Sequence, residues 1–336
     1  MILKDTKSTK YTKNSFQNKI ICGETLSVLR RLPSNSVQTI ITSPSYFLRK
    51  EYENKSENFQ TYLKNHKEII KESKRVLKKN GAIFWNVAQT VHEGEILPLG
   101  AIFYNIFKDL NFFLKNWIIW KFEGGECPRT RLFGRYENVL WMVKNKDDYL
   151  FNIDEIRVPT KWLKDKRVRN DGKNPEDFWI LDDRKNEEKL NLIKSKLSKY
   201  KKLISEKKKD YVNQILMDEI TRDIEDQLND MLETKEKILN KNLQDNIWHI
   251  NRVVNISKRE KIKHPKTKKA HPCPFPERLI ERIIKMSSNK NDLVLDIFSG
   301  SGTVMKVANQ LNRKWCGIDM DKEYCEIAEI RVKNKN

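Results

Sequence analysis

The chain has 336 residues, of which 38% are hydrophobic, 10% aromatic and 33% charged. This length allows one large domain or two ordinary ones, with ample material for a packed core. The formal net charge is +20 and the isoelectric point is about 9.5. Such a charge is typical of a protein with a polyanionic partner, although a lysine-rich surface from a biased genome gives the same value.

Cysteine and histidine usage indicates neither a disulfide framework nor a metal site. The cysteines at positions 22, 127, 273, 316 and 325 form no Cys-x-x-Cys pair, and the five histidines are dispersed. The N-terminus lacks the apolar core of a signal peptide, and no hydrophobic run approaches transmembrane length. We therefore expect an intracellular protein in a reducing compartment, with no metal and no membrane partner.

The first 150 residues alternate between predicted strands and predicted helices. A helix is expected at 24–32, and a charged helical stretch is expected to stop at Gly81. The predicted strands span residues 19–22, 37–42, 82–87, 117–122 and 138–145. Continuous apolar strands separated by amphipathic helices indicate a parallel sheet covered on both faces.

The strand at 37–42 ends abruptly in a polar loop with an aromatic residue at its tip. Its sequence runs from Thr39 through Ser43-Pro44-Ser45-Tyr46 to Phe47. An ordinary turn at a sheet edge has this composition. A substrate clamp, with a hydroxyl and a carbonyl aimed at a ligand below an aromatic ring, has it as well.

The middle of the chain has a different character, since no glycine or proline occurs between Glu176 and His264. Apolar residues recur there at coiled-coil spacing, at Leu190, Ile193, Leu197, Tyr200 and Ile204 and again at Ile220, Ile224, Leu228 and Leu232. We interpret residues 151–265 as an inserted region that holds an antiparallel helical hairpin at about 185–240.

Residues 266–336 return to the alternating pattern and contain a loop suited to a nucleoside. Gly300 and Gly302 allow the backbone to approach a ligand, and the helix that follows offers free N–H groups. Asp319 ends the next predicted strand, where doubly wound folds place an acid on ribose hydroxyls. The run Ser-Gly-Ser-Gly-Thr lacks the third glycine of a dinucleotide loop and the lysine of a P-loop. A nucleoside that carries a sulfonium group is therefore a better candidate ligand for this loop than a dinucleotide or a nucleoside triphosphate.

Together these motifs resemble those of the β-class, permuted DNA amino-methyltransferases, which use S-adenosyl-L-methionine. DIFSGSGT is similar to their D-P-F-x-G-S-G-T cofactor loop, and TSPSY is similar to their T-S-P-P-Y catalytic loop. The resemblance covers roughly residues 18–180 and 246–334. Other segments that carry it are GETLSVLRRLPSNSVQTIITSPSY, WIIWKF, RLFGRYENVLWMVK, KNPEDFW and HPCPFPERLIERII.

The resemblance implies an α/β fold, a doubly wound Rossmann-like methyltransferase sheet that is mostly parallel with one antiparallel strand. The catalytic loop precedes the cofactor loop, so the fold is expected to be circularly permuted. Residues 1–150 then form the catalytic half, 151–265 a helical target-recognition region, and 266–336 the cofactor-binding half. Three departures stand out: Ser45 replaces a proline, Ile297 replaces another, and Tyr136 precedes Glu137 where histidine is usual.

The resemblance also assigns residues to a site. Expected catalytic residues are Ser43, Pro44, Ser45 and Tyr46. Expected cofactor-binding residues are Asp296, Phe298, Ser299, Gly300, Gly302, Thr303, Asp319, Glu24 and Phe275. For Glu24 the alternative is simple helix capping, and for Phe275 it is packing of the following helix.

Two basic stretches flank the expected hairpin and are candidates for phosphate contacts on double-stranded DNA. Solvated surface charge is the alternative interpretation. The candidate residues are Lys161, Lys164, Lys166, Arg167, Arg169, Lys258, Arg259, Lys261, Lys263, Lys266, Lys268 and Lys269.

Three functions remain open from the sequence. The leading hypothesis is methylation of cytosine N4 in double-stranded DNA, since the family tends to pair a Ser-Pro-Pro-Tyr loop with cytosine. The alternatives are methylation of adenine N6 and a DNA-binding module that has lost methyl transfer, with Ser45 as the lesion. The expected setting is a restriction–modification system in the cytoplasm of a prokaryote, with a cognate restriction endonuclease as a candidate partner.

Overall fold

The structure is a computed structural model that describes most of the two predicted halves. The described residues are 2–4, 10–12, 14–48, 57–122, 129–132, 134–157, 175, 178–180, 263–268 and 274–334. The helical hairpin predicted at about 185–240 lies outside these ranges.

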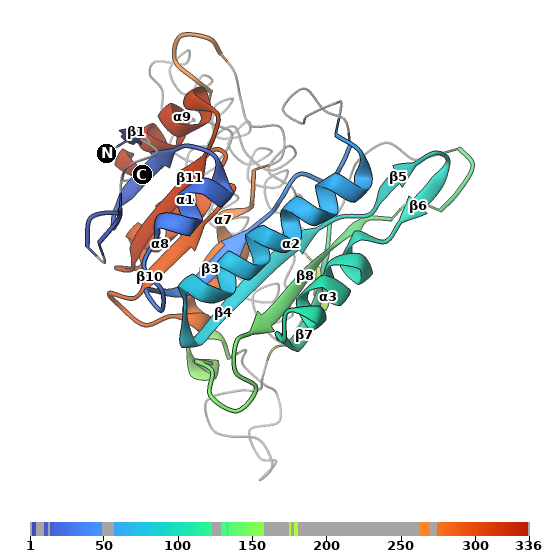
Figure 1. The fold of residues 1–336 in the computed structure, drawn as a ribbon, viewed down its shortest axis with the longest axis horizontal. Helices are drawn as coiled ribbons and strands as arrows, with labels where there is room; N and C mark the ends of the chain where they lie inside the picture. The colour runs from blue at the N-terminus through green and yellow to red at the C-terminus, as the bar shows by residue number, and fades with distance from the viewer. Residues whose placement is uncertain are drawn as a thin grey trace, which may run out of the picture.

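A mixed sheet of nine strands organises the described chain (Figure 1). In spatial order the strands are β1 Ile2–Lys4, β2 Lys19–Cys22, β11 Lys314–Asp319, β10 Leu293–Asp296, β3 Val37–Thr42, β4 Leu77–Val87, β8 Tyr136–Val143, β7 Phe113–Lys121 and β9 Phe178–Ile180. β8 runs antiparallel to both of its neighbours, and all other pairings in this sheet are parallel. The expected mostly parallel sheet with one antiparallel strand is therefore confirmed.

The two ends of the chain meet in the middle of this sheet. β10 and β11, which come last in the sequence, lie between β2 and β3, and Val294 of β10 pairs with Thr39 of β3. β1, at the N-terminal end, contacts α9 (Lys322–Lys333), at the C-terminal end (Figure 1). This connectivity confirms the circular permutation predicted from the order of the motifs.

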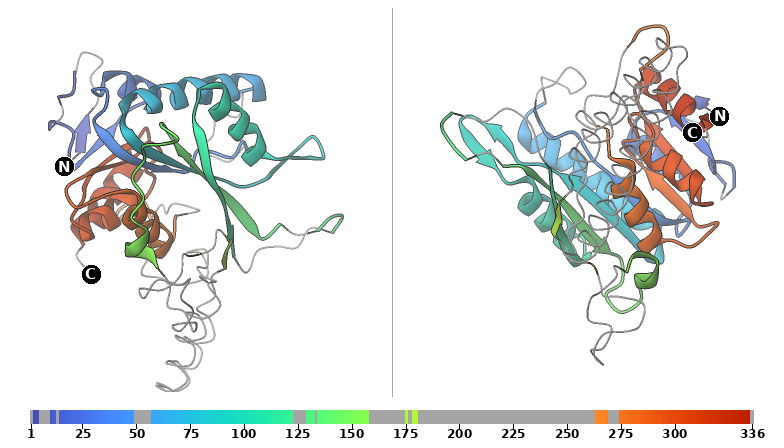
Figure 2. Two further views of the ribbon diagram at one scale, coloured as in Figure 1. Left: turned by 90° about the horizontal axis from the view of Figure 1, so that it is seen from below. Right: turned by 180° about the vertical axis from the view of Figure 1, so that it is seen from behind.

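Helices cover both faces of the sheet (Figure 2). One face carries α1 Thr25–Arg31, α2 Phe59–Val76 and α3 Leu99–Asp109. The other carries α7 Glu277–Ser287, α8 Thr303–Gln310, α9 and the short 3-10 helix η1 Ile153–Ile156. Each face has its own apolar core, the first including Val28, Ile70 and Phe103 and the second including Ile280 and Val304.

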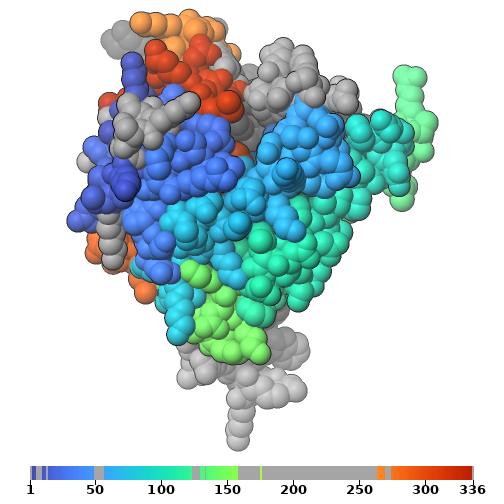
Figure 3. All heavy atoms as spheres, in the orientation of Figure 1, coloured from blue at the N-terminus to red at the C-terminus, as the bar shows by residue number. Residues whose placement is uncertain are grey.

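The hairpin of β5 (Thr90–His92) and β6 (Glu95–Leu97) is separate from the main sheet. It stands out from the body of the molecule beyond the helices of the first face (Figure 3). Val91 and Ile96 pair across it and remain 45% and 41% exposed.

Gly81 does not stop a helix, contrary to the sequence-based prediction. α2 already ends at Val76, and Gly81 lies inside β4, which begins at Leu77. A Cβ atom at Gly81 would lie 2.9 Å from the Gln38 carbonyl oxygen, so glycine is required there by the close approach of β3. Gly81 therefore marks a close contact between two strands, and not the end of a helix, which glycine often signals.

β9 falls within residues 151–265, which the sequence assigns to the inserted region. It nevertheless pairs in parallel with β7 as the edge strand of the main sheet. η1 is also attached to the methyltransferase-like body, because the Asn152 amide donates to the Met286 carbonyl of α7 at 2.8 Å. Part of the predicted insert therefore belongs to the sheet and its helical layer.

Candidate functional site

A cavity of about 510 Å³ opens at the carboxyl ends of the central strands. Loops that follow β3, β10 and β11 reach it, and the antiparallel direction of β8 brings the start of that strand to the same edge. Ligands of doubly wound sheets bind at this edge, where the strand order reverses. Eleven predicted site residues line the cavity: Ser43, Pro44, Ser45, Tyr46, Phe275, Asp296, Phe298, Ser299, Gly300, Thr303 and Asp319.

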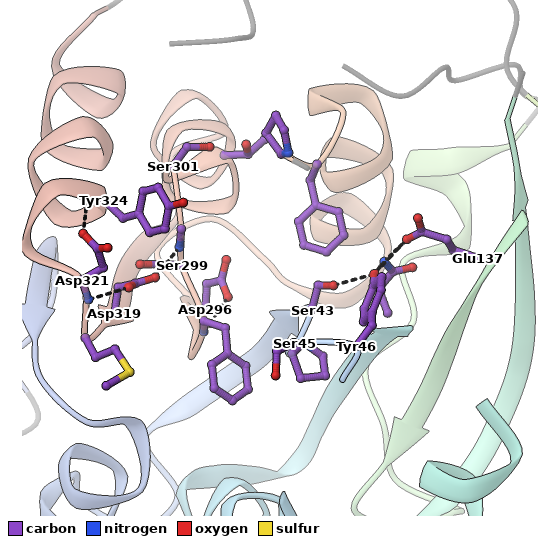
Figure 4. Close-up of a pocket in the computed structure, with 18 of the residues that line it drawn as sticks. Ser43, Ser45, Tyr46, Glu137, Asp296, Ser299, Ser301, Asp319, Asp321 and Tyr324 are labelled. Atoms are coloured by element: carbon purple, nitrogen blue, oxygen red, sulfur yellow. Dashed lines mark hydrogen bonds between the residues drawn. The ribbon is translucent and has the colours of Figure 1, made fainter. Parts of the chain in front are cut away.

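The loop after β3 is held by a hydrogen-bond network around the Tyr46 hydroxyl (Figure 4). Tyr46 Oη donates to Glu137 Oε2 at 2.9 Å and accepts from Asn86 Nδ2 at 2.8 Å. Ser43 Oγ lies 2.7 Å from the same Tyr46 oxygen. Because the Tyr46 proton is used on the carboxylate, Ser43 is the donor in this contact. The Ser43 oxygen is thus left with lone pairs that can accept.

The backbone of this loop is fixed from the first helical layer. Tyr62 Oη donates to the Ser45 carbonyl at 2.6 Å, and Phe47 adopts a positive φ of 56°. A bulky residue in that conformation is strained and needs surrounding support. The Phe47 ring packs against the rings of Phe59 and Tyr62 at 5.2 and 5.3 Å, which supplies that support.

Asp296 joins the two loops that sequence analysis singled out. Its Oδ1 accepts from Thr42 Oγ1 at 2.9 Å, at the end of β3, and from the Phe298 amide at 3.1 Å. Burial raises the pKa of the Asp296 carboxyl to about 7, and nearby Asp319 acts in the same direction. The two hydrogen bonds oppose this shift of the pKa but do not cancel it.

Asp319 orients the cofactor loop from the end of β11. Its Oδ2 accepts from the Gly300 amide at 2.7 Å, and its Oδ1 accepts from the Asp321 amide at 2.9 Å. Asp321 then caps α9 by accepting from the amides of Glu323 and Tyr324. Asp321 is thus the capping residue of α9, and Asp319 lines the cavity.

Two predicted cofactor residues, Glu24 and Gly302, are not among those that line the cavity. Glu24 is exposed and caps α1, with its two carboxylate oxygens accepting from the Leu26 and Ser27 amides at 2.8 and 2.6 Å. Gly302 has a positive φ of 82°, and a Cβ atom there would lie 2.7 Å from Ala328 Cβ. In the structure Glu24 thus caps α1 and Gly302 allows α8 to pack tightly on α9, while their contacts with the cofactor stay predictions.

The structure adds residues that sequence analysis did not assign to the site, notably His66, Asn86, Glu137, Ser301, Asp321 and Tyr324. Asn86 lies near the carboxyl end of β4, a position that strand direction alone could have singled out. Glu137 was visible only as part of an unusual Tyr-Glu pair. His66 lies on α2, and no local sequence pattern distinguishes it.

His66 presents a neutral imidazole to the cavity. Burial lowers its pKa to about 4. Its Nδ1 lies 2.8 Å from the Tyr62 carbonyl oxygen, which can only accept, so Nδ1 carries the proton. Nε2 is then an acceptor, and it has no partner among the described residues.

Comparison with known proteins gives the family. The family profile described as DNA methylase matches residues 37–330. The chain belongs to this DNA methylase family. It is 31% identical to the type II methyltransferase M.BglII of Bacillus subtilis over 322 residues, covering 93% of this chain and 68% of that protein. It is 26% identical to the DNA adenine methyltransferase YhdJ of Escherichia coli, covering 93% and 82%.

A solved structure with a similar fold is the cytosine-N4-specific PvuII DNA methyltransferase. The TM-score is 0.56 at 19% sequence identity, and the match covers 94% of this chain and 86% of that one. This likeness supports the fold alone. Together with the sheet order, it establishes the Rossmann-like methyltransferase fold expected from the sequence.

S-adenosylmethionine is the methyl donor of the DNA methylase family, and the cavity fits such a group. Ser299 is 5% exposed, and its hydroxyl has no partner among the described residues, so the cavity contains an unsatisfied polar atom. A Cβ atom at Gly317 would meet the end of the Met305 side chain and would lie 3.1 Å from Ser299 Cβ, so glycine in β11 leaves room for both residues. Acidic groups for ammonium and ribose hydroxyls are present in Asp296 and Asp319.

Most of the predicted DNA-contacting residues lie outside the described part of the chain. Lys263, Lys266 and Lys268 are described and are exposed. Within the described ranges, no group of three or more metal-ligating side chains occurs. No helix there is long and apolar enough to cross a membrane.

Proposed function

We propose that this DNA methylase transfers the methyl group of S-adenosylmethionine to the exocyclic N4 amine of cytosine in double-stranded DNA. The observation that carries this proposal is the state of Ser43. The residue at the head of the catalytic loop is a neutral hydroxyl whose proton is engaged by Tyr46, so its oxygen faces the cavity as an acceptor.

An acceptor is what this chemistry needs. The lone pair of an exocyclic amine is delocalised into the base, so the nitrogen is a weak nucleophile. Hydrogen bonds accepted from its N–H groups return electron density to the nitrogen. Ser43 Oγ takes one N–H and the Pro44 carbonyl takes the other, in a direction restricted by the proline ring. No strong base is required first, because the proton leaves after the nitrogen has become cationic.

Tyr46 supplies a flat surface for the target base. A base inside a duplex must be flipped out before its amine can enter a cavity of this kind. Stacking of a base on an aromatic ring contributes about 1–3 kcal/mol. Glu137 and Asn86 restrain the Tyr46 ring through its hydroxyl, so the stacking surface is set before the base arrives.

The opposite side of the same cavity would hold the cofactor, which supplies an electrophilic methyl group on a sulfonium when bound. Asp296 would accept hydrogen bonds from the ammonium of its amino-acid portion, and Asp319 would accept them from its ribose hydroxyls. Phe275 and Phe298 line the cavity from two different loops and would contact the adenosine portion. The residues thus act by positioning two reactants for in-line transfer.

Adenine N6 is the second candidate substrate, because YhdJ, a relative with 26% identity, is named as an adenine methyltransferase. The two amines are electronically alike, and the network around Tyr46 serves either of them. Ser43 favours cytosine through the family tendency to pair a serine loop with that base. The neutral His66 Nε2 and the Asn86 Oδ1, which has no partner among the described residues, are further acceptors near the target.

The basic middle of the chain completes the proposal. Residues 151–265 provide target recognition, and the lysines and arginines that flank the hairpin predicted from the sequence contact phosphates. Lys263, Lys266 and Lys268 are exposed next to His264, which is fixed to α9 by a 2.7 Å contact with Glu326. A restriction–modification system with a cognate endonuclease is the proposed setting.

Transfer of a labelled methyl group to unmethylated DNA of mixed sequence tests the proposal. The wild-type protein should label the DNA, and Ser43→Ala should lose most of the label. Asp319→Ala should weaken cofactor binding by about 1.5–3 kcal/mol, the size of a charge-assisted hydrogen bond. A protein that binds the cofactor but labels no DNA would instead support the impaired DNA-binding module, with Ser45 in the catalytic loop as its lesion.

A further inference from the structure

Arg331 is a buried arginine behind the cofactor loop, and neither the sequence motifs nor the proposed mechanism uses it. It lies in the last turn of α9 and is 0% exposed. Its Nη1 donates to Ser301 Oγ at 3.0 Å and also to Thr303 Oγ1. Both residues line the cavity. A single guanidinium nitrogen therefore holds the hydroxyl groups of two residues that line the cavity.

The sequence brings Arg331 to this place through close helix packing. Gly302 allows the start of α8 to approach Ala328 of α9, where a Cβ atom on residue 302 would come within 2.7 Å. Arg331 follows Ala328 by three positions and so lies on the same face of α9. Its side chain thus reaches the residues on either side of Gly302.

The direction of these hydrogen bonds decides what the hydroxyls do. Arginine can only donate, so Ser301 and Thr303 accept from it and keep their own protons. In the described part of the chain, neither hydroxyl donates to another group. Both are therefore available as donors to a ligand in the cavity, and the adjacent positive charge makes them stronger donors.

The start of α8 adds to the same surface. Gly302 provides no side-chain cap, so the first amides of α8 have no capping partner in the described structure. Ser299, which lies in the same loop and lines the same cavity, is 5% exposed, and its hydroxyl has no partner among the described residues (Figure 4). Hydroxyl protons, helix amides and a buried positive charge together form a site for an anion.

We infer that Arg331 positions Ser301 and Thr303 to bind the α-carboxylate of the cofactor. This inference rests on the proposed cofactor site. The amino-acid portion of S-adenosylmethionine carries an ammonium and a carboxylate, and the acids Asp296, Asp319 and Asp321 suit only the first. The described residues that line the cavity include no lysine or arginine, so Arg331 supplies positive charge to the carboxylate from behind the hydroxyls.

Two ligands that differ only in the amino-acid portion separate this role from simple packing. S-adenosylhomocysteine carries the carboxylate, whereas 5′-methylthioadenosine keeps the adenosine and the thioether without it. Arg331→Met should weaken binding of S-adenosylhomocysteine by about tenfold or more, the effect of one charge-assisted hydrogen bond. Binding of methylthioadenosine, measured by the same calorimetry, should stay within about twofold. Arg331→Lys should recover part of the loss.

Matched controls exclude nonspecific effects. Lys333→Met removes a positive charge from the same turn of α9, but its side chain is 58% exposed, and both affinities should be unchanged. If Arg331→Met does not fold, Thr303→Val removes one of the two hydroxyls without loss of volume. Thr303→Val should weaken binding of S-adenosylhomocysteine more than binding of methylthioadenosine.

Equal weakening of both ligands in these variants, or no weakening of either, would overturn the inference. A wild-type protein that binds neither ligand would overturn the cofactor site and this inference with it. Binding of S-adenosylhomocysteine without methylation of DNA would contradict only the proposed function. The effect of Arg331→Met on ligand binding could still be measured and interpreted.

Discussion

Ser43 and Tyr46 are coupled at the scale of single residues, because the proton of Tyr46 decides which way the Ser43 hydroxyl points. Ser43→Ala removes the acceptor for the amine. We expect kcat to fall by roughly 10- to 100-fold, corresponding to about 1.5–3 kcal/mol for a hydrogen bond that strengthens as charge develops.

Two substitutions of Tyr46 separate its ring from its hydroxyl. Tyr46→Phe keeps the stacking surface but releases Ser43 from its acceptor, so kcat should fall while the KM for DNA changes little. Tyr46→Ala should instead weaken DNA binding by about 1–3 kcal/mol. Steady-state kinetics with wild type and both variants make this comparison, and an identical KM for all three proteins would remove Tyr46 from base stacking.

Asp296 provides a pH-dependent prediction, since burial raises the pKa of its carboxyl to about 7. Below that pH the free protein holds a proton that must leave before the carboxylate can accept the cofactor ammonium. Affinity for S-adenosylhomocysteine should therefore rise with pH up to about 7 and then level off, with a limiting slope of roughly tenfold per pH unit. Asp296→Asn should bind more weakly and show no such slope; a wild-type affinity that is flat across this range would contradict the assignment.

The same proton has a consequence for the unliganded fold. The folded-state pKa of Asp296 lies above the ordinary value of 3.8, so between these two values the folded state binds more protons than the unfolded state. The contribution of this group to stability thus falls as pH rises from 3.8 toward about 7. Cofactor binding opposes that loss by giving the carboxylate a positive partner.

At the scale of elements, the contact between α8 and α9 sets the shape of the cofactor loop. Gly302 and Gly94 both have positive φ, at 82° and 84°, but only Gly302 has neighbours where a Cβ atom would be placed. Gly94→Ala should therefore cost only the conformational penalty, about 1–2 kcal/mol. Gly302→Ala should cost more, because α8 must move away from Ala328, and it should also weaken cofactor binding.

Chemical denaturation of both variants measures this difference directly. Equal losses of unfolding free energy would mean that α8 and α9 adjust without cost. A normal cofactor affinity in a destabilised Gly302→Ala protein would separate helix packing from the shape of the loop.

Most strands were predictable from the sequence, because continuous runs of apolar residues are typical of buried strands. The strand 37–42 was predicted with the bounds it has, and all six of its residues are buried. The end of α2 was not predictable from Gly81, since helix and strand follow one another directly at Val76 and Leu77 with no loop residue between them. The close approach of β3 that requires Gly81 is a tertiary contact that local sequence does not encode.

In the site as well, residues in continuous motifs were predictable, whereas residues brought together only by folding were not. Loop residues such as Ser43 and Asp319 were found because their motifs are short and continuous. Glu137, Asn86 and Arg331 were missed because each acts on a loop that is distant in the chain, through contacts made only after the sheet has formed. Glu24 caps α1 in the structure, and its contact with the cofactor stays a prediction from the family resemblance.

At the scale of the whole molecule, the net charge of +20 leads to a prediction about DNA. Lys263, Lys266 and Lys268 are exposed and lie in the segment that leads into the cofactor half. If all three contact phosphates, replacing them with glutamine should reduce the slope of log K against log salt by about 0.9 each. Replacing Lys79, which is 81% exposed, serves as a control.

Fluorescence anisotropy over a range of salt concentrations measures this slope. An unchanged slope and affinity in the triple variant would show that the segment 263–268 does not face DNA. An equal effect of the Lys79 replacement would mean that the charge acts through the overall field and not through contacts.

The identity of the methylated base tests the proposed methylation of cytosine N4 most directly. The protein is incubated with unmethylated DNA of mixed sequence and labelled S-adenosylmethionine, the DNA is digested to nucleosides, and the products are identified by mass spectrometry. We expect N4-methylcytosine from the wild-type protein and almost none from Ser43→Ala. N6-methyladenine as the sole methylated nucleoside would contradict the assignment of Ser43 to cytosine.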